Sequence, residues 1–417
     1  MNRTPGAEPG VAPSSSEPRS RVHVAGVVTA VVGMTSSFAV VLAGLTAVGA
    51  SPGQAASGLL ALCVLQGLGT VLLAQRHRAP VVLAWSTPGA ALLAAAGAVD
   101  GGWSAAVGAF ALTGLLLLAT AAIPVLGDAV ARIPAPVAQA MLAGVLVPLC
   151  LTPVRSLVAE PLLVAPVVVV WVAVLALRPR LAAPVAIGVA LAIALVAGTR
   201  DGGITGPFLP HVEWTTPGLS WGAVVGIAIP LWIVTMAAQN VPGAAVLASF
   251  GYRAPWRASL TVTGVATVLG APFGGHALNL AAISAALSAG PDGGADTTRR
   301  WLAARTAGVT YLVLALLAAS LTAVVLGAPG DLLIAAAGLA LLGTLGSSLS
   351  AAVASPVGRE AAVVTFVVAV SGITLAGVGA AFWALLSGLA VHGALLLTRR
   401  RERPAPPDSP GHDATAR

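Results

Sequence analysis

Long stretches of this chain contain no Asp, Glu, Lys or Arg, and this limits the folds that it can adopt. Charged residues make up only 8% of its 417 residues, whereas a soluble domain carries about 25%. A helix that crosses a bilayer needs about 20 apolar residues, and several stretches leave room for two such helices and a turn. The sequence therefore predicts an all-α multi-pass membrane protein. The uncharged stretches include 24–75, 214–252, 258–291, 306–330, 332–358 and 361–398.

The net charge of +7 does not indicate a nucleic-acid partner. All 21 basic residues are Arg, and they are scattered between the apolar runs and at the two ends of the chain. Cys63 and Cys150 lie inside apolar runs, without the spacing of a metal site or a disulfide framework. We therefore expect no bound metal and no cofactor.

Turn signals and charges divide the chain into fourteen apolar segments, seven on each side of a polar stretch. If the N-terminus is cytoplasmic and every segment crosses the membrane, 19 of the 21 Arg residues fall on the cytoplasmic side, as the positive-inside rule requires. Only Arg155 and Arg200 fall outside. Both termini are therefore predicted to be cytoplasmic. The segments are 24–48, 53–75, 80–98, 103–126, 133–152, 161–177, 181–198, 219–248, 256–271, 273–290, 302–326, 332–354, 360–377 and 380–398.

The ends of the chain are polar and differ from its middle. Residues 1–22 are predicted to be a disordered cytoplasmic N-terminus, and the apolar run after them is too long for a signal-peptide core of about 7–15 residues. Two seven-segment repeats, 23–198 and 219–398, are joined by an extracytoplasmic linker, 199–218. Residues 399–417 are predicted to be a disordered basic cytoplasmic tail, which either contacts anionic lipid headgroups or serves only as a topology anchor.

Because seven is odd, the second set of segments enters the membrane from the opposite side to the first. This is the arrangement of an inverted-topology repeat, a common plan among transporters. The third segment of each set is opened by Pro and Gly, in AWSTPGAALLAAAG (84–97) and APFGGHALNLAAISAALSAG (271–290). Interrupted segments at matching positions indicate a transport site, although Pro and Gly also permit close helix packing. We expect segments 3 and 10 to be short half-helices preceded by extended strands.

In segment 3, Ser86 and Thr87 are suited to cap a helix that begins near Pro88, and Gly89 would let a ligand approach. A segment that changes from extended to helical leaves free N–H groups at the helix start. These groups and the helix dipole favour an anion. The backbone of 86–89 is therefore a candidate binding site for a carboxylate.

In segment 10, Gly274 and Gly275 would allow close approach, and His276 and Asn279 are predicted to lie one turn apart on one helix face. Two helix starts facing one cavity would each contribute up to about 2 kcal/mol toward a carboxylate. A micromolar site requires about 8 kcal/mol. The remainder must come from side-chain hydrogen bonds and apolar contact, which favours a ligand with a sizeable hydrophobic body.

Two further polar clusters lie within apolar segments, where polar side chains usually face the protein interior. In the eighth segment, Thr235 precedes a Gln-Asn pair and Pro242 follows it, which suggests a kink that frees carbonyls. In the first segment, hydroxyls either bond back to helix carbonyls or face a ligand. Both clusters are included in the candidate substrate site, as Gln239, Asn240, Thr35, Ser36 and Ser37.

No Asp or Glu lies well inside a predicted span, although proton-coupled transporters often use such residues. If a side chain carries the proton, His276 is the leading candidate, because imidazole exchanges protons near neutral pH. Alternatively, the substrate acid carries the proton, water relays it, or His276 only forms a hydrogen bond. The lack of an acid, a metal cluster or a nucleophile with its base argues against a membrane-embedded enzyme. A channel is a further alternative that accumulation against a gradient would exclude.

Three stretches together resemble the benzoate/proton symporter family. They are TMAAQNVPGAAVLASFGY (235–252), TGVATVLGAPFGGHALNLAAISAALSAGPD (263–292) and RRWLAARTAGVTYLV (299–313), in the same order and at similar spacing. WSTPGAALL (85–93) resembles the family more loosely. The likeness covers about 24–398. It implies import of benzoate or a similar aromatic carboxylate with a proton; the alternative is a nucleobase or inorganic-anion transporter of the same fold.

The family is similar in architecture to uracil/xanthine permeases and sulfate-type anion transporters. The likeness implies fourteen segments in a seven-plus-seven inverted repeat, with substrate at the half-helix starts of segments 3 and 10 and further contacts from segment 8. Gln239 stands where nucleobase permeases often carry a binding Glu, and Gly275 stands near a second such position. Without these acids a carboxylate is not repelled. Related folds are often dimers, so a homodimer is a further expectation.

Overall fold

The computed structural model describes residues 19–123, 125–127, 132–200, 208–282, 284–356, 358–375 and 378–401. Within them, eight helices are long and apolar enough to cross a membrane, or nine when the pair Thr297–Ala315 and Ala318–Leu326, bent by 59°, counts as one span. Two shorter apolar helices, Thr87–Ala96 and Pro161–Leu177, accompany these. The prediction of a mostly helical multi-pass membrane protein is confirmed.

In the first half of the chain, helices begin and end where Pro, Gly or a capping residue interrupts the apolar sequence. Ser51 caps one of them reciprocally: its Oγ accepts from the Gln54 N–H, and the Gln54 side chain accepts from the Ser51 N–H. The elements are α1 (Arg19–Thr35), α2 (Phe38–Ala47), α3 (Pro52–His77), β1 (Leu83–Trp85), α4 (Thr87–Ala96), α5 (Gly102–Ala122), α7 (Ala135–Ala159), α8 (Pro161–Leu177) and α9 (Pro179–Arg200).

The second half contains more short elements, because its helices are interrupted by π-helical and 3₁₀ turns. The elements are α10 (Trp221–Ala223), the π-helix η1 (Val224–Ala228), α11 (Ile229–Thr235), the π-helix η2 (Met236–Asn240), α12 (Val241–Ser249), α13 (Trp256–Gly270), the 3₁₀ turn η3 (Ala271–Phe273), β2 (Leu278–Leu280), α14 (Ala285–Ala289), the 3₁₀ turns η4 (Pro291–Gly293) and η5 (Thr297–Arg299), α15 (Trp301–Ala315), α16 (Ala318–Leu326), α17 (Leu332–Val353), α18 (Arg359–Val370), β3 (Thr374–Leu375), β4 (Val378–Gly379) and α19 (Ala380–Arg401).

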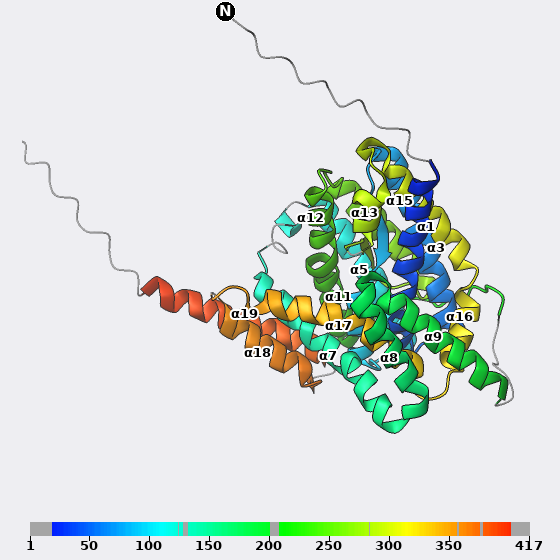
Figure 1. The fold of residues 1–417 in the computed structure, drawn as a ribbon. Helices are drawn as coiled ribbons and strands as arrows, with labels where there is room; N and C mark the ends of the chain where they lie inside the picture. Colours follow the sequence, from blue (N-terminus) through cyan, green and yellow to red (C-terminus); the bar gives the residue numbers. More distant parts are fainter. Residues whose placement is uncertain are drawn as a thin grey trace, which may run out of the picture.

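The helices form two packed groups, which can be followed in Figure 1. The core group contains α1–α5 and α10–α16, and its closest pairs are α3 with α15, α5 with α13, and α1 with α15. The flanking group contains α7–α9 and α17–α19, held by contacts of α7 with α17 and α18, and of α18 with α19. The groups meet where α4 contacts α7 and where α2 contacts α17.

Two short strands lie inside the core group, far apart in sequence but paired in space. β1 and β2 are antiparallel, with Ala84 opposite Asn279. Unpaired backbone groups are costly within a membrane, and here side chains satisfy three N–H groups on the outer edges of the two strands. The Leu83 N–H donates to Thr70 Oγ1, the Leu278 N–H to Thr267 Oγ1, and the Leu280 N–H to Asn240 Oδ1.

Each strand leads into a short helix, in agreement with the pattern expected for segments 3 and 10. After β1, α4 begins at Thr87, as predicted. After β2, α14 begins only at Ala285. The expected helix through His276 and Asn279 is therefore wrong. Pro272 and the left-handed Gly274 (φ 89°) end the preceding helix, and pairing with β1 keeps the chain extended beyond them.

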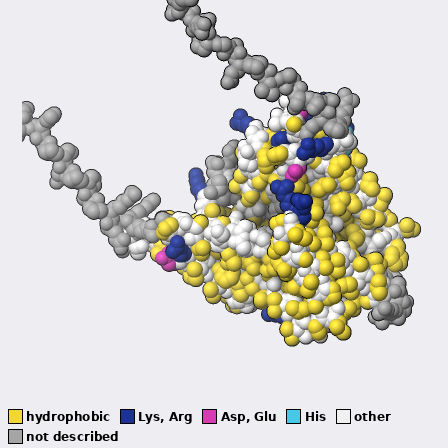
Figure 2. All heavy atoms as spheres, in the orientation of Figure 1, with side chains coloured by type: hydrophobic (Ala, Val, Ile, Leu, Met, Phe, Trp, Pro, Cys, Tyr) yellow, Lys and Arg dark blue, Asp and Glu magenta, His cyan; other side chains and the backbone are white. Residues whose placement is uncertain are grey.

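The exposed surface is largely apolar. Figure 2 shows hydrophobic side chains over most of the visible face, with Arg side chains gathered mainly toward one end. On α8 alone, Leu162, Val169 and Leu177 are 90%, 64% and 78% exposed. Soluble monomers rarely expose apolar patches this extensive, so this surface fits a lipid environment.

The predicted chain ends and linker are described only in part. Residues 1–18, 201–207 and 402–417 lie outside the described residues. α1 begins at Arg19, within the N-terminal stretch predicted to be disordered, and α19 continues to Arg401, within the predicted tail. In both places the helix extends past the apolar run into its flanking arginines.

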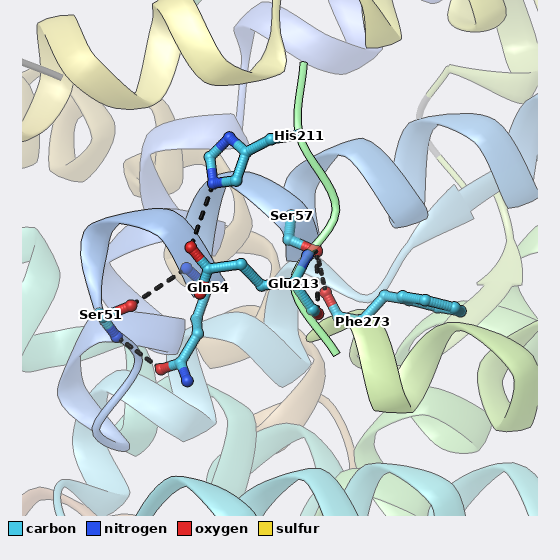
Figure 3. A network of polar contacts seen from close by, with 6 residues as sticks. All are labelled: Ser51, Gln54, Ser57, His211, Glu213 and Phe273. Atoms are coloured by element: carbon cyan, nitrogen blue, oxygen red, sulfur yellow. Dashed lines mark hydrogen bonds and ion pairs between the residues drawn. The ribbon is translucent and has the colours of Figure 1, made fainter. Parts of the chain in front are cut away.

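The described end of the linker packs on the core group, as Figure 3 shows. The Glu213 N–H donates to Ser57 Oγ over 3.0 Å, and Ser57 Oγ donates to the Phe273 carbonyl over 2.9 Å. The Glu213 carboxylate fills the space that a Cβ on Gly53 would occupy at the start of α3, where the helix dipole favours a negative charge. His211 Nε2 lies 3.2 Å from the same carboxylate. The linker thus joins α3 to the turn before β2.

Candidate functional site

A cavity of about 100 Å³ lies between the core group and the flanking group. α1, α3, η2, α15 and the two strand–helix turns form one wall, and α7 and α17 form the other. Drug-sized ligands occupy pockets of about 300–1,000 Å³, so this cavity suits a smaller molecule. The predicted site residues that line it are Ser36, Ser37, Thr87, Pro88 and Gln239.

The start of α4 faces this cavity and has the predicted cap. Ser86 Oγ accepts from the Gly89 N–H over 3.1 Å and from Thr235 Oγ1 over 3.0 Å. Thr87 and Pro88 follow and line the cavity. Among the described residues, the Thr87 N–H has no hydrogen-bond acceptor. The cap therefore leaves a backbone donor at a positive helix end.

Gly89 does not serve the predicted purpose. A Cβ at this position would collide with the Leu231 side chain of α11. The absence of a side chain on Gly89 therefore lets α4 and α11 pack closely, and the position is not among the residues that line the cavity.

The second helix start contributes less than expected. α14 has only five residues, so its aligned peptide dipoles are few. Ala281, Ala282 and Ser284 bring this turn to the cavity wall. The expectation of two equal positive helix ends is therefore replaced by one ten-residue helix, α4, and a short turn opposite it.

His276 and Asn279 are not one turn apart on a helix face, because both precede α14: Asn279 lies in β2, and His276 lies in the irregular backbone just before that strand. With its amide oriented by its hydrogen-bond partners, Asn279 donates to the carbonyls of Ala84 (2.6 Å) and Trp85 (3.2 Å) on β1. His276 is fully buried, and its ring packs edge-on against Phe110 with centroids 6.4 Å apart. Neither residue lines the cavity.

Gly274 and Gly275 also lie away from the cavity lining. A Cβ on Gly274 would lie 2.9 Å from the Gln54 carbonyl and 3.2 Å from the Gly58 Cα of α3. A Cβ on Gly275 would lie 3.2 Å from the Gly270 carbonyl. These glycines allow the turn before β2 to pack against α3 and α13, as the packing alternative expects.

The Gln-Asn pair of the eighth segment divides between two roles. Instead of a kink, the chain forms the π-helix η2, a feature frequent at functional sites. Gln239 is half-buried and lines the cavity. Asn240 is fully buried and holds β2, since its Oδ1 accepts from the Leu280 N–H over 2.9 Å.

The hydroxyl cluster of the first segment marks a helix break between α1 and α2. Thr35 Oγ1 donates to the Val31 carbonyl, and the Ser36 and Ser37 hydroxyls donate to the Gly33 carbonyl. Ser37 Oγ also accepts from the Trp85 indole N–H over 2.9 Å. Ser36, Ser37 and Trp85 line the cavity, whereas Thr35 does not.

Four polar lining residues were not predicted: Gln66 on α3, Ser284 before α14, Tyr311 on α15 and Thr344 on α17. Gln66 is 1% exposed, and within the described structure neither atom of its amide has a hydrogen-bond partner. The Tyr311 hydroxyl occupies the space beside Gly33 that a Cβ would fill. A lone Gln in an apolar span, and one of only two Tyr residues in the chain, were the available signals.

The cavity contains no Asp, Glu, Lys, Arg or His among its described lining residues. Across the described part of the chain, no cluster of three His, Cys, Asp or Glu side chains could hold a metal ion. The arrangement offers a backbone donor, amides, hydroxyls and an indole ring, which suits reversible binding of a small polar group attached to an apolar body.

Comparisons with known proteins give relatives of this chain in sequence and in fold. The family model "Benzoate membrane transport protein" matches residues 17–394. The chain is 36% identical over 382 residues to the inner membrane protein YdcO of Escherichia coli, covering 91% of this chain and 97% of that protein. It is 27% identical over 326 residues to the benzoate membrane transport protein of Acinetobacter baylyi, covering 78% and 82%.

Two solved structures share the fold. SLC26A9 aligns with a TM-score of 0.67 at 13% identity, over 91% of this chain and 66% of that one, so this chain spans about two thirds of it. The transmembrane domain of the cyanobacterial bicarbonate transporter BicA aligns with a TM-score of 0.59 at 17% identity, over 88% and 97%.

Together these findings identify a multi-pass cell-membrane transporter and not an enzyme. The resemblance seen in the motifs of segments 8 to 11 is confirmed, because the family model covers nearly the whole chain. The chain belongs to the benzoate membrane transport protein family.

Proposed function

We propose that this protein imports benzoate, or a similar aromatic carboxylate, together with a proton. The observation that carries the proposal is the small cavity at the start of α4, whose described lining residues offer donors but no acidic side chain. The curated relative from Acinetobacter baylyi, named a benzoate transporter, supports the same substrate. An acidic residue at Gln239 would repel a carboxylate; the amide present here does not.

The free energies that the cavity can contribute to binding fit a substrate with one aromatic ring. The start of α4 adds up to about 2 kcal/mol for a negative group. Burying an aromatic ring removes about 150–250 Å² of surface from water, worth about 4–6 kcal/mol at 25 cal/mol per Å². Together they approach the about 8 kcal/mol of a micromolar site. Trp85 provides an aromatic wall next to the helix start.

The proposed topology is fourteen crossings in two inverted repeats, 23–198 and 219–398, with both termini cytoplasmic. The antiparallel pairing of β1 with β2 supports it, because equivalent strands of an inverted repeat run in opposite directions.

Access to the cavity would alternate between the two sides of the membrane as the core group moves against the flanking group, since the cavity lies between them. A homodimer and contact of the tail with lipid stay predictions.

The alternative is a nucleobase or inorganic anion carried by the same fold. The SLC26A9 and BicA likenesses are compatible with anion transport, but at 13% and 17% identity they support the fold alone. The apolar wall formed by Trp85, Leu146 and Leu341 favours an aromatic acid over a hydrated inorganic anion.

Counterflow in proteoliposomes tests this choice of substrate. Vesicles loaded with unlabelled benzoate should take up external labelled benzoate, and excess uracil or sulfate should not reduce that exchange. Protein-free vesicles provide the control for passive entry of benzoic acid. Exchange that uracil or sulfate suppresses, with no specificity for benzoate, would favour the alternative.

A further inference from the structure

Among the described residues of the cavity wall, Gln66 is the fully buried polar side chain without a hydrogen-bond partner. It lies in the middle of α3, is 1% exposed, and has neither a donor for its Oε1 nor an acceptor for its Nε2 within the described structure. Buried amides are nearly always hydrogen-bonded, and each unpaired group costs about 1–3 kcal/mol. A side chain kept at this cost next to a cavity is suited to bind a ligand.

The backbone around Gln66 is fixed by close helix packing. A Cβ on Gly67 would lie 2.8 Å from the Gly308 carbonyl, and a Cβ on Gly308 would lie 2.7 Å from the Gly67 carbonyl. α3 and α15 therefore meet backbone to backbone beside Gln66, as small residues permit in membranes. Tyr311 follows one turn along α15 and lines the same cavity.

A carboxamide presents one acceptor and one donor side by side. An ionised carboxylate has only acceptors, so it would satisfy Nε2 but place its second oxygen against the lone pairs of Oε1. A protonated carboxyl group has an O–H donor beside a C=O acceptor and matches both atoms of the amide. The α4 N–H of Thr87 is then available for the second lone pair of that C=O.

We propose that Gln66 binds the protonated carboxyl group of the substrate through this two-point pairing, so that the substrate itself carries the proton. The inference rests on the proposed function and names the group that recognises the acid. On the more acidic side, a carboxylate and one proton give the neutral acid, which Gln66 binds. On the other side the acid is released and dissociates into the carboxylate and the proton, so one proton accompanies each acid.

This route explains how the protein can couple to protons without an acidic side chain in the cavity. Burying an ionised carboxylate in apolar surroundings costs more than the about 2 kcal/mol that the start of α4 offers a negative group, and protonation removes that cost. His276 is not required, which agrees with its position outside the cavity lining.

Competition by two benzoate analogues tests the pairing on the unmodified protein. Benzamide is neutral at all accessible pH values and has a donor beside an acceptor, whereas benzenesulfonate is always ionised and has only acceptors. Benzamide should suppress benzoate counterflow at neutral pH, and benzenesulfonate should not. Suppression by benzenesulfonate but not by benzamide would overturn the inference.

Substitutions at Gln66 test whether this residue pairs with the carboxyl group of the substrate. Gln66→Met keeps the shape but removes both polar atoms; it should raise the half-saturating benzoate concentration about tenfold and abolish competition by benzamide. Gln75→Met is the matched control, because Gln75 is an exposed residue on the same helix, outside the cavity. Unchanged affinity and unchanged benzamide competition in Gln66→Met would contradict the inference.

Gln66→Glu provides a rescue with a pH signature. A protonated Glu again offers a donor beside an acceptor, while an ionised Glu has only acceptors, so counterflow relative to the wild-type protein at the same pH should recover as the pH falls. A structural role for Gln66 would give no such recovery.

The wild-type protein distinguishes failure of the two proposals. If it exchanges no benzoate at all, the proposed function fails. If it exchanges benzoate but benzamide does not compete, only the Gln66 inference fails.

Discussion

At the scale of single residues, side chains that hold the strands are sequence neighbours of side chains that line the cavity. Ser86 caps α4 while Thr87 faces the cavity, and Asn240 holds β2 while Gln239 faces the cavity. The sequence is sufficient to identify both kinds of residue as polar residues within apolar segments. Which of the two lines the cavity and which holds a strand depends on backbone geometry, and at Gln239 and Asn240 the backbone is a π-helix.

His276 shows why part of the site could not be predicted. Its helix-face position followed from the breakers before it, but the chain there leads into β2, which pairs with β1 in the first half of the chain. Long-range pairing of this kind leaves no local pattern. Gln66 was overlooked for the opposite reason, since an isolated Gln gives no cluster and its importance is visible only as an unpaired amide.

The first prediction concerns His276. His276→Gln places a neutral amide beside Phe110 that exchanges no proton near neutral pH, and it should retain both benzoate counterflow and uptake driven by a proton gradient. Both rates are measured in the same proteoliposomes. If gradient-driven uptake is lost while counterflow persists, His276 is the proton carrier and the substrate is not.

At the scale of elements, the strand pair is held by hydroxyls and an amide from three surrounding helical segments. Thr70, Thr267 and Asn240 accept from the outer N–H groups of β1 and β2. The sequence predicted the strand–helix pattern of both segments and the cap of α4. It misplaced the start of α14, because the residues directly after Gly274 and Gly275 were expected to be helical.

The second prediction separates the two members of the Gln-Asn pair. Asn240→Ala leaves the buried Leu280 N–H unpaired, which costs about 1–3 kcal/mol, so it should lower the apparent melting temperature in detergent. The Gln239 side chain lines the cavity and has no hydrogen-bond partner in the described structure. Gln239→Ala should therefore leave the melting temperature unchanged and weaken benzoate binding. Equal melting temperatures for the two variants would show that Asn240 does not hold β2.

At the scale of the whole molecule, a cavity between two helix groups fits a carrier whose groups move relative to each other. The charge-free runs were sufficient to predict a multi-pass membrane protein, because nothing else tolerates so much uncharged sequence. They could not predict how the helices divide into groups, since helix packing in a membrane depends on small-residue contacts such as Gly67 with Gly308, which are common throughout this chain.

The central claim is coupled movement of an aromatic acid and a proton. Proteoliposomes with an alkaline interior, placed in acidic medium, should accumulate labelled benzoate faster and to a higher initial level than protein-free vesicles under the same gradient. A protonophore should abolish the difference. Identical accumulation with and without the protein, or protein-dependent uptake that ignores the protonophore, would contradict the account.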